Sequence, residues 1–368
     1  MSESKPQPTP DFETLYPRVL HFGLDYGDLM RVRAAAFDWS SWGSALATLA
    51  ETFDAAGNEA SAGGRTISAT EYWRRAADYF HFSQIKLIDG AAKPEWQARV
   101  RVNYKKLAGA LNPVSVPMAV PFRESFLPAY FRAAADSVPC VVLIGGLDSA
   151  KEVELHYFAE CFLRRGLSVC YFDGPGQGEL SGKLHMDSHF EEAVSSILDF
   201  LETKAPSRVT RVGLFGVSFG GYLACRSAAV DSRVRACISL GGFFDAQVFK
   251  RLPPPALANL RRAFGLDEGV SIDGVSATIT LAPLQGRLKC PLFLIHGCDD
   301  HLVDEAQVAA ISGWASGPTR VWMIKGAEHV CTNRFSECLP VLADWMRARL
   351  IDDGGLYSRD GNDDANIR

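Results

Sequence analysis

A serine set between glycines is the strongest chemical signal in the sequence. The motif GVSFGG at residues 216–221 follows the apolar run RVGLFG and precedes the helix-forming run YLACRSAAV. A G-x-S-x-G motif at a strand-to-helix turn holds the serine in a strained conformation and directs its hydroxyl above the sheet. The N-terminus of the following helix favours a developing negative charge. We therefore interpret Ser218 as a candidate nucleophile, the alternative being a tight turn with an incidental serine.

Candidate partners for this serine follow it in the chain. A serine hydroxyl is a weak nucleophile and requires an imidazole base that is itself oriented by a carboxylate. The run CPLFLIHGCDD ends at Asp299 and Asp300, and the run TRVWMIKGAEH ends at His329, so both follow predicted strands. The spacing in H-G-x-x-D favours Asp300 as the acid, with Asp299 as the alternative. Asp304 is better placed to cap the following helix.

An oxyanion formed at the attacked carbonyl requires two backbone N–H donors. We expect the first from Phe219, the residue after the serine. We expect the second from the loop GGLDS at residues 145–149, where glycines let the backbone approach a substrate. Our choice is the Leu147 amide, with Gly146 as the alternative.

The sequence around these residues predicts an α/β core. From Val138 onward, short runs rich in Val, Ile and Phe alternate with helical stretches, which implies a mainly parallel sheet covered on both faces. The preceding runs VSVPMAVPF and ESFLPAYFRAA are expected to pair as strands. The stretch at about 246–288 contains a Pro triplet and breaks the alternation, so we interpret it as a small lid insertion over the strand ends.

The chain is predicted to have three parts. Helix-period segments dominate between about residues 25 and 111, so residues 1–112 are expected to form a helical module that serves as a lid and pocket wall. Residues 113–350 would form the core. Residues 351–368 are polar and rich in Gly and Asp, which predicts a flexible tail.

Composition and charge exclude several classes of partner. The chain has 38 Lys and Arg against 43 Asp and Glu, a net charge of −5, which offers no basic surface for nucleic acid or an anionic membrane. No apolar run approaches the ~20 residues of a membrane span, and the first residues lack the pattern of a signal peptide. The nine cysteines contain no C-x-x-C pair and lie mostly in apolar runs. We therefore predict a cytoplasmic protein with free thiols and a small-molecule substrate.

The sequence predicts neither a metal nor another cofactor. The loop DGPGQGE at residues 173–179 lacks both the G-K-[ST] ending of a phosphate loop and the G-x-G-x-x-G spacing, so we interpret it as a rigid turn that shapes the pocket floor. His185 and His189 are four residues apart, but no H-E-x-x-H motif or carboxylate partner accompanies them.

Together, GVSFGG, HGCDD, GAEH and the glycine loop resemble the α/β-hydrolase superfamily over roughly residues 113–350. With the helical module, GGLDSAKE and DGPGQGE, the chain is similar to the group that contains 2,6-dihydroxypseudooxynicotine hydrolase, the fermentation-respiration switch protein family and fungal polyketide-shortening hydrolases. The resemblance implies cleavage of a carbon–carbon bond next to a carbonyl in a 1,3-diketone-like, often aromatic substrate, and a homodimer. Some members use an additional acid near the strand after the serine's helix, for which Asp245 is the nearest candidate.

We therefore expect a serine hydrolase in which His329 activates Ser218 or a water. The main alternative is an ester, thioester or lactone hydrolase, because the same groups cleave acyl esters. A lyase or cyclase of natural-product biosynthesis is a further alternative. A non-catalytic receptor is disfavoured, because it would not need a complete set of nucleophile, base and acid.

Overall fold

The computed structural model describes residues 12–88, 93–205, 207–267 and 269–352. From residue 353 onward, the predicted tail at 351–368 lies outside this part of the chain. Within it, an eight-stranded sheet has the order β1-β2-β4-β3-β5-β6-β7-β8. The strands are β1 (Val116–Phe122), β2 (Ser125–Arg132), β3 (Val138–Ile144), β4 (Ser168–Phe172), β5 (Val209–Val217), β6 (Val234–Leu240), β7 (Leu292–Gly297) and β8 (Thr319–Ile324).

The sheet is mainly parallel, as predicted. β1 and β2 form an antiparallel hairpin, β2 is antiparallel to β4, and the remaining neighbours are parallel. The interior strands β3 and β4 are buried along nearly their whole length, which is typical of strands covered on both faces. β1 instead alternates exposed and buried residues and contains Pro117 and Pro121, which an edge strand tolerates because it has unpaired N–H positions.

Helices cover both faces of the sheet and separate its core into two apolar clusters. On one face lie α6 and α12, which contribute Phe158 and Trp345. On the other lie α7 and α8, which contribute Ile197 and Leu223. The helices and turns of the core are η2 (Lys151–Leu155), α6 (His156–Leu163), η3 (Gly178–Leu180), α7 (Glu191–Thr203), α8 (Phe219–Val230), α11 (Glu305–Trp314), η6 (His329–Arg334) and α12 (Phe335–Leu350).

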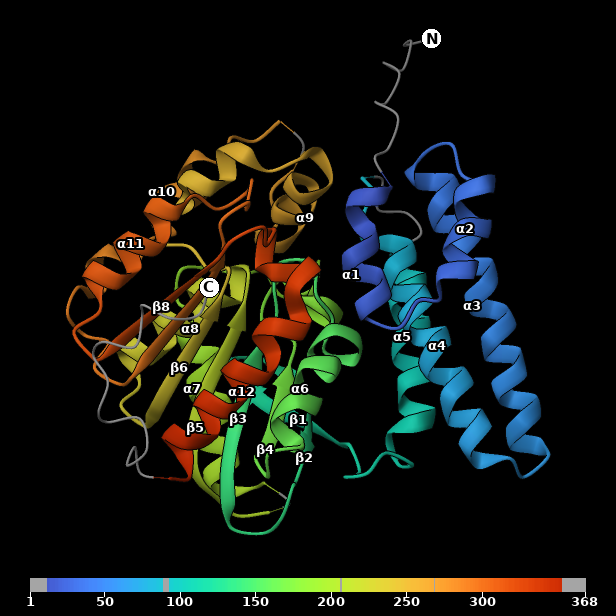
Figure 1. The fold of residues 1–368 in the computed structure, drawn as a ribbon, viewed down its shortest axis with the longest axis horizontal. Helices are drawn as coiled ribbons and strands as arrows, with labels where there is room; N and C mark the ends of the chain where they lie inside the picture. The colour runs from blue at the N-terminus through green and yellow to red at the C-terminus, as the bar shows by residue number, and fades with distance from the viewer. Residues whose placement is uncertain (1–11, 89–92, 206, 268, 353–368) are drawn as a thin grey trace.

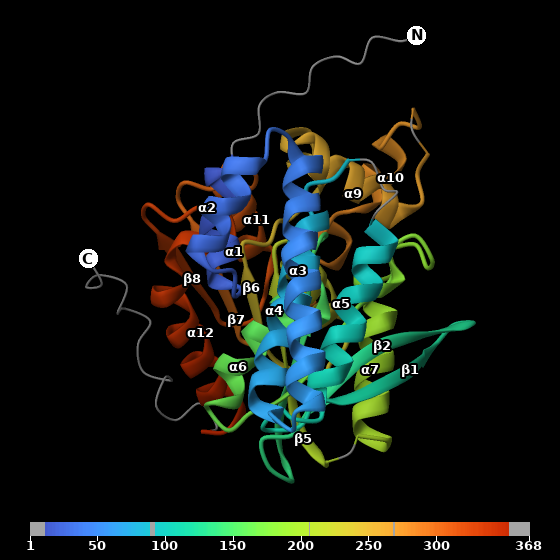
Figure 2. The same ribbon diagram turned by 90° about the vertical axis from the view of Figure 1, so that its right-hand side faces the viewer.

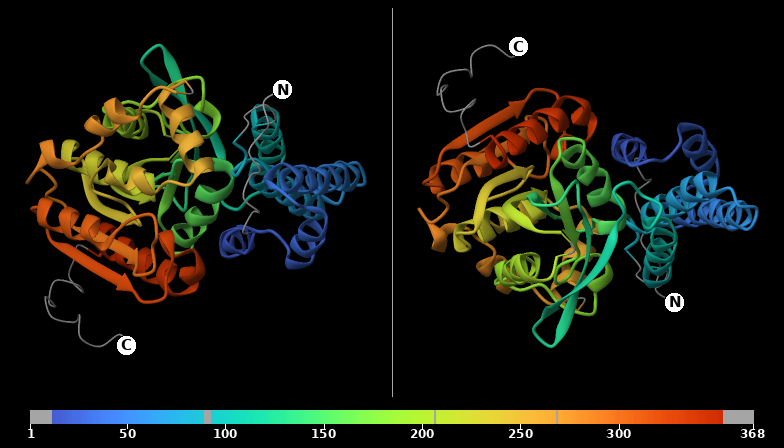
Figure 3. Two further views of the ribbon diagram at one scale, coloured as in Figure 1. Left: turned by 90° about the horizontal axis from the view of Figure 1, so that it is seen from above. Right: turned by 90° about the horizontal axis from the view of Figure 1, so that it is seen from below.

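The N-terminal helices pack beside the sheet and share its core. Leu46 and Phe80 of these helices belong to the same apolar cluster as Phe158 and Phe215 of the α/β core. Figures 1 and 2 show the long helices α3, α4 and α5 side by side on this flank, and Figure 3 shows the same arrangement from above and below. The elements are η1 (Glu13–Leu15), α1 (Tyr16–His21), α2 (Tyr26–Ala35), α3 (Trp39–Ala62), α4 (Thr66–Gln84) and α5 (Lys93–Ala108).

The stretch between β6 and β7 forms the insertion over the strand ends (Figure 1). It consists of η4 (Ala246–Arg251), α9 (Pro254–Phe264), α10 (Asp273–Thr278) and η5 (Ala282–Leu284). Its α9 also reaches the helical module, because Asn259 accepts a hydrogen bond from Lys93 Nζ at 2.6 Å and its amide lies 3.4 Å from the carbonyl of Ile85. The insertion and the module therefore meet.

Two further sequence features have structural counterparts. All nine cysteines are free thiols in the structure. Among the helices of the described residues, none combines the length and the apolar character that crossing a membrane requires.

Candidate active site

Ser218 lies at a sharp turn between β5 and α8. Its backbone has φ 55° and ψ −121°, a strained combination for a residue with a side chain. The neighbouring chain segments approach so closely that a methyl group on Gly216 would lie 2.0 Å from the carbonyl oxygen of Gly220, and one on Gly220 would lie 2.2 Å from that of Ile144. Glycines are therefore required on both sides of the serine.

The structure brings Ser218, His329 and Asp300 into one hydrogen-bonded chain. Ser218 Oγ lies 2.8 Å from His329 Nε2, and His329 Nδ1 lies 2.7 Å from Asp300 Oδ2. The other carboxylate oxygen, Oδ1, accepts hydrogen bonds from the amides of Leu302 and Val303 at 2.8 and 2.9 Å. The imidazole keeps 24% of its surface exposed, whereas the carboxylate keeps none. A ligand can thus reach the base but not the acid behind it.

Asp300 is held in its ionised form. Burial alone would raise the pKa of its carboxyl group, but the hydrogen bond and charge of His329 outweigh burial and lower that pKa. An ionised carboxylate can orient a neutral imidazole and stabilise an imidazolium. The alternative acid, Asp299, lines the neighbouring cavity instead. Asp304 accepts from the amide of Ala306 at 3.0 Å, which confirms its predicted role as a helix cap.

The loop that carries His329 contains backbone strain that the sequence does not signal. Val330 and Cys331, directly after the histidine, have φ values of 51° and 57°. Such values are rare for residues other than glycine, and especially for a β-branched valine. Among the described residues, five non-glycine positions have positive φ, and three of them are Ser218, Val330 and Cys331. Strain of this kind persists only where the surrounding structure imposes it.

The glycine loop after β3 lies against the serine, and its contacts distinguish the two candidate donors. Gln177 Nε2 donates to the carbonyls of Gly145 at 2.6 Å and Gly146 at 3.3 Å. In a trans peptide the next N–H points the opposite way, so the Leu147 amide faces away from Gln177. The Gly146 amide donates to Ser149 Oγ at 3.1 Å. The loop therefore leaves the Leu147 amide as the candidate oxyanion donor.

The Phe219 amide is the other candidate donor. Phe219 is the first residue of α8, where a backbone N–H has no acceptor within the helix. A methyl group on Gly146 would lie 3.4 Å from Ser218 Cβ, so the glycine loop and the serine turn are in contact. The two amides thus come from segments that adjoin the serine on either side.

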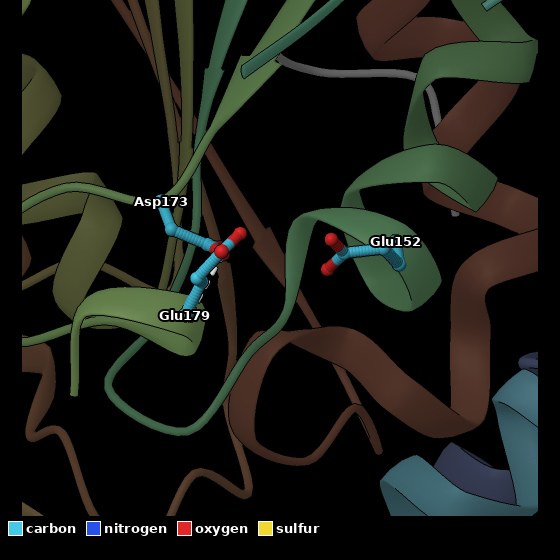
Figure 4. A group of neighbouring side chains, drawn as sticks. All are labelled: Glu152, Asp173 and Glu179. Atoms are coloured by element: carbon cyan, nitrogen blue, oxygen red, sulfur yellow. Dashed lines mark hydrogen bonds between the residues drawn. The ribbon is translucent and has the colours of Figure 1, made fainter. Parts of the chain in front are cut away.

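The loop DGPGQGE supports the glycine loop instead of lining the cavity at Ser218, which corrects the expectation of a pocket floor. Its two acidic residues, Asp173 and Glu179, lie near Glu152, and Figure 4 shows the three carboxylates facing a common centre. Lys151 Nζ lies 2.7 Å from Glu152, 2.8 Å from Asp173 and 3.1 Å from Glu179. Burial alone would lower the pKa of Lys151, but these carboxylates raise it. The cluster already shares a cation, and we assign no metal to it.

A cavity of about 530 Å³ opens at Ser218. The α/β core, the insertion and the helical module all contribute to its walls. Its aromatic lining consists of Phe22, Phe158, Phe219, Phe243, Phe249 and Phe335. A mainly apolar cavity of this size with a few polar groups is typical of a site for a small organic molecule.

Asp245 lies outside this cavity, which corrects the expectation of an auxiliary acid there. Its carboxylate accepts from the amide of Gln247 at 3.0 Å and from Gln307 Nε2 at 3.1 Å. The same segment presents Val248 and Phe249 to the cavity. Asp245 therefore anchors the start of the insertion, and we assign it no role in the reaction.

Arg18 of α1 reaches the glycine loop and was missed in the sequence. Its guanidinium donates to Asp148 at 2.9 and 3.2 Å and to Glu154 at 2.7 and 3.0 Å. Burial alone would raise the pKa values of Asp148 and Glu154, but the Arg18 charge lowers both. The acidic residues in GGLDSAKE were visible in the sequence, but their partner lies about 130 positions earlier, and no local pattern identifies it.

An α/β sheet with a serine at this turn and a histidine at the end of a later strand defines an α/β hydrolase, and the protein is an enzyme of this class. The family model described as FrsA-like esterase matches residues 36–253, and the chain belongs to that family.

Individual relatives extend over most of the chain. It is 27% identical to 2,6-dihydropseudooxynicotine hydrolase of Paenarthrobacter nicotinovorans over 94% of both proteins. It is 32% identical to Hydrolyase poxO of Penicillium oxalicum over 69% of this chain and 64% of the relative, so the match spans less than two thirds of the fungal protein. The crystal structure of 2,6-dihydroxy-pseudo-oxynicotine hydrolase superposes with a TM-score of 0.83 at 26% identity, over 92% of this chain and 96% of that one.

Proposed function

We propose that the protein is a serine hydrolase that cleaves a carbon–carbon bond next to a carbonyl in a 1,3-diketone-like or acyl-aromatic small molecule. The observation that carries the mechanism is the continuous chain of hydrogen bonds from Ser218 through His329 to Asp300 at the cavity. Similarity to a pseudooxynicotine hydrolase over 94% of both chains and the aromatic cavity wall support an aromatic ketone as substrate.

The first half-reaction forms an acyl-enzyme. Ser218 Oγ attacks the scissile carbonyl carbon while His329 Nε2 takes the hydroxyl proton. The carbonyl oxygen becomes an oxyanion that accepts from the amides of Phe219 and Leu147. The bond to the neighbouring carbon then breaks, and its electron pair moves into the second carbonyl to give an enolate. The imidazolium protonates the enolate carbon, and the ketone product leaves.

The second half-reaction restores the enzyme. His329 takes a proton from a water molecule, whose oxygen attacks the acyl carbon on Ser218. The new oxyanion collapses, Ser218 Oγ recovers the proton from His329, and a carboxylic acid leaves. The sum is one diketone and one water converted to one acid and one ketone.

Hydrolysis of an ester, thioester or lactone is the second candidate function. The matching family model is described as an FrsA-like esterase, which favours this alternative. The same nucleophile, base and amides would act, but an alkoxide or thiolate leaves without a second carbonyl to accept electrons. The two functions therefore use the same catalytic groups and differ in the leaving group.

A substrate panel tests the proposal. Wild type and Ser218→Ala would be incubated with aryl 1,3-diketones, p-nitrophenyl esters and acyl thioesters in H₂¹⁸O, and the products resolved by mass. Ser218-dependent cleavage of a diketone into ketone and ¹⁸O-labelled acid is the expected result. Turnover of esters or thioesters alone would move the assignment to the second function. Products without ¹⁸O would indicate a lyase or cyclase.

The cytoplasmic location and the homodimer stay predictions. Free thiols at all nine cysteines support a reducing compartment. Analytical ultracentrifugation of the purified protein would measure the oligomeric state.

A further inference from the structure

Two basic side chains of the helical module line the cavity. They are Arg18 and Lys86, and both line the same space as Ser218. The guanidinium of Arg18 is occupied, because it donates four hydrogen bonds to Asp148 and Glu154. Arg18 therefore serves to hold these two carboxylates, and its donors are directed at them.

Lys86 is placed differently. It follows the C-terminal end of α4, where the helix dipole favours a positive charge. Its Nζ lies 5.8 Å from the ring centre of Trp39, a cation–π distance that holds the ammonium on this wall. Within the described part of the chain, no group accepts a hydrogen bond from this ammonium or forms an ion pair with it.

The surroundings of Lys86 make its positive charge less favourable than that of a lysine in water. Burial lowers the pKa of Lys86, the charge of Arg18 lowers it further, and the charge of Asp148 opposes both. The Lys86 side chain is half-buried, and its ammonium has donors free to meet a ligand at the cavity. A ligand oxygen in the cavity would accept from this ammonium, and an anionic oxygen would form the strongest hydrogen bond with it.

The proposed cleavage generates such an oxygen. The amides of Phe219 and Leu147 serve the scissile carbonyl, whereas the broken carbon–carbon bond delivers its electron pair to the second carbonyl. That oxygen becomes an enolate, and a fixed cation close to it would stabilise the transition state more than the ground state.

We propose that Lys86 forms an enolate-binding subsite, in which its ammonium donates to the non-scissile carbonyl oxygen of a 1,3-diketone and stabilises the enolate that forms there. The inference rests on the proposed function and extends it. No proton leaves Lys86 in this step, because the imidazolium of His329 protonates the carbon. The helical module would thereby stabilise the electron sink, the second carbonyl of the substrate, which carbon–carbon cleavage needs and ester hydrolysis does not.

A kinetic comparison tests this role. Lys86→Met removes the charge and Lys86→Arg keeps it, while Lys105→Met is the matched control, because Lys105 is an exposed lysine of the same module. Each variant would be assayed with 1-phenyl-1,3-butanedione and with p-nitrophenyl butyrate. Loss of one donor to a developing anion typically costs about 100-fold in kcat. We expect Lys86→Met to lower the diketone-to-ester ratio of kcat by about that factor, Lys86→Arg to recover most of it, and Lys105→Met to leave the ratio unchanged. An equal fall for both substrates, or none, would overturn the proposal.

A binding measurement separates this inference from the proposed function. Ser218→Ala would be titrated with 1-phenyl-1,3-butanedione, and the ultraviolet band of its enolate followed against pH. We expect the bound diketone to ionise at lower pH than the free one, and the Ser218→Ala/Lys86→Met double variant to lose this effect. If wild type does not cleave the diketone but the Lys86-dependent enolate band appears, the proposed function fails and the subsite stands. If cleavage occurs but neither kcat nor the band depends on Lys86, the subsite fails and the proposed function stands.

Discussion

The two walls of the cavity use charge in opposite ways. On the core wall, two consecutive hydrogen bonds link Asp300 to His329 and His329 to Ser218, whose hydroxyl lies at the cavity. On the module wall, Arg18 is fully engaged by carboxylates, and Lys86 donates to no acceptor in the described part of the chain. Under the proposed function, the core wall supplies the nucleophile, the base and the acid for acyl transfer. The module wall would add Lys86, the cation proposed to favour carbon–carbon cleavage over ester hydrolysis.

The largest loss of activity is expected from substitution of Ser218, the last residue of the hydrogen-bonded chain on the core wall. Ser218→Ala removes the nucleophile, and single losses of this kind typically lower kcat by about 10⁵-fold or more. The diketone and the ester should lose activity together, since both depend on Ser218. Circular dichroism and ligand binding would show that the fold is retained. Residual activity close to that of wild type would mean that His329 activates water directly.

A second pair of substitutions on the core wall tests which of the neighbouring carboxylates, Asp299 or Asp300, orients His329. Asp300→Asn leaves the imidazole without an anion to orient it, and loss of this orientation typically costs about 10⁴-fold in kcat. Asp299→Asn should cost much less, because Asp299 lines the cavity and the contact with His329 Nδ1 belongs to Asp300. Measuring kcat/KM for both variants decides between them, and the reverse order would transfer the role of the acid to Asp299.

The two walls also differ in how far the sequence predicts them. The serine turn, the acid and the histidine each lie within a few residues of a strand end, so local motifs and strand order suffice to place them. The alternation of strands and helices likewise predicted the mainly parallel sheet.

Other features depend on contacts between distant parts of the chain. Gln177 holds the carbonyls of Gly145 and Gly146 in the glycine loop, and Gln307 holds the Asp245 carboxylate at the start of the insertion. No local motif in the sequence identifies the partner of either glutamine. Lys86 is in the same situation, because its position in the cavity results from the packing of the module on the core.

Loss of the contact between Arg18 of the module and Asp148 of the glycine loop should lower kcat by an intermediate factor. Arg18→Met removes the cation that holds Asp148, next to the candidate donor Leu147, so the glycine loop loses its fixed position. Small displacements of a positioning group cost up to about 100-fold, and we expect a fall of about 10-fold to 100-fold in kcat for the diketone and the ester alike. Arg18→Lys should recover only part of the lost kcat, since an ammonium cannot make bidentate hydrogen bonds to both carboxylates as the guanidinium does. Arg65→Met, at an exposed arginine of the module, is the control. A loss confined to the diketone would place Arg18 with Lys86 in the subsite.

The smallest effect is expected at the contact between the module and the insertion. Asn259→Ala removes the hydrogen bond from Lys93 at 2.6 Å and the contact with the carbonyl of Ile85. One such bond contributes about 1 kcal/mol, or roughly 5-fold in KM, with little change in kcat because no reacting group moves. Lys93→Met should have a similar effect, and the double variant should add nothing, which a double-mutant cycle measures.

The charge of Lys93 sharpens this last prediction. Burial and the charge of Arg262 lower the pKa of Lys93, the charge of Asp148 opposes them, and the resulting pKa is about 8. Lys93 is therefore protonated below pH 8, where its bond to Asn259 is charge-assisted, and neutral above it, where the bond is weaker. The ratio of KM between Asn259→Ala and wild type should accordingly fall between pH 7 and pH 9. A ratio that is constant with pH would mean that the carbonyl of Ile85, which does not titrate, supplies the contact that keeps the insertion over the cavity.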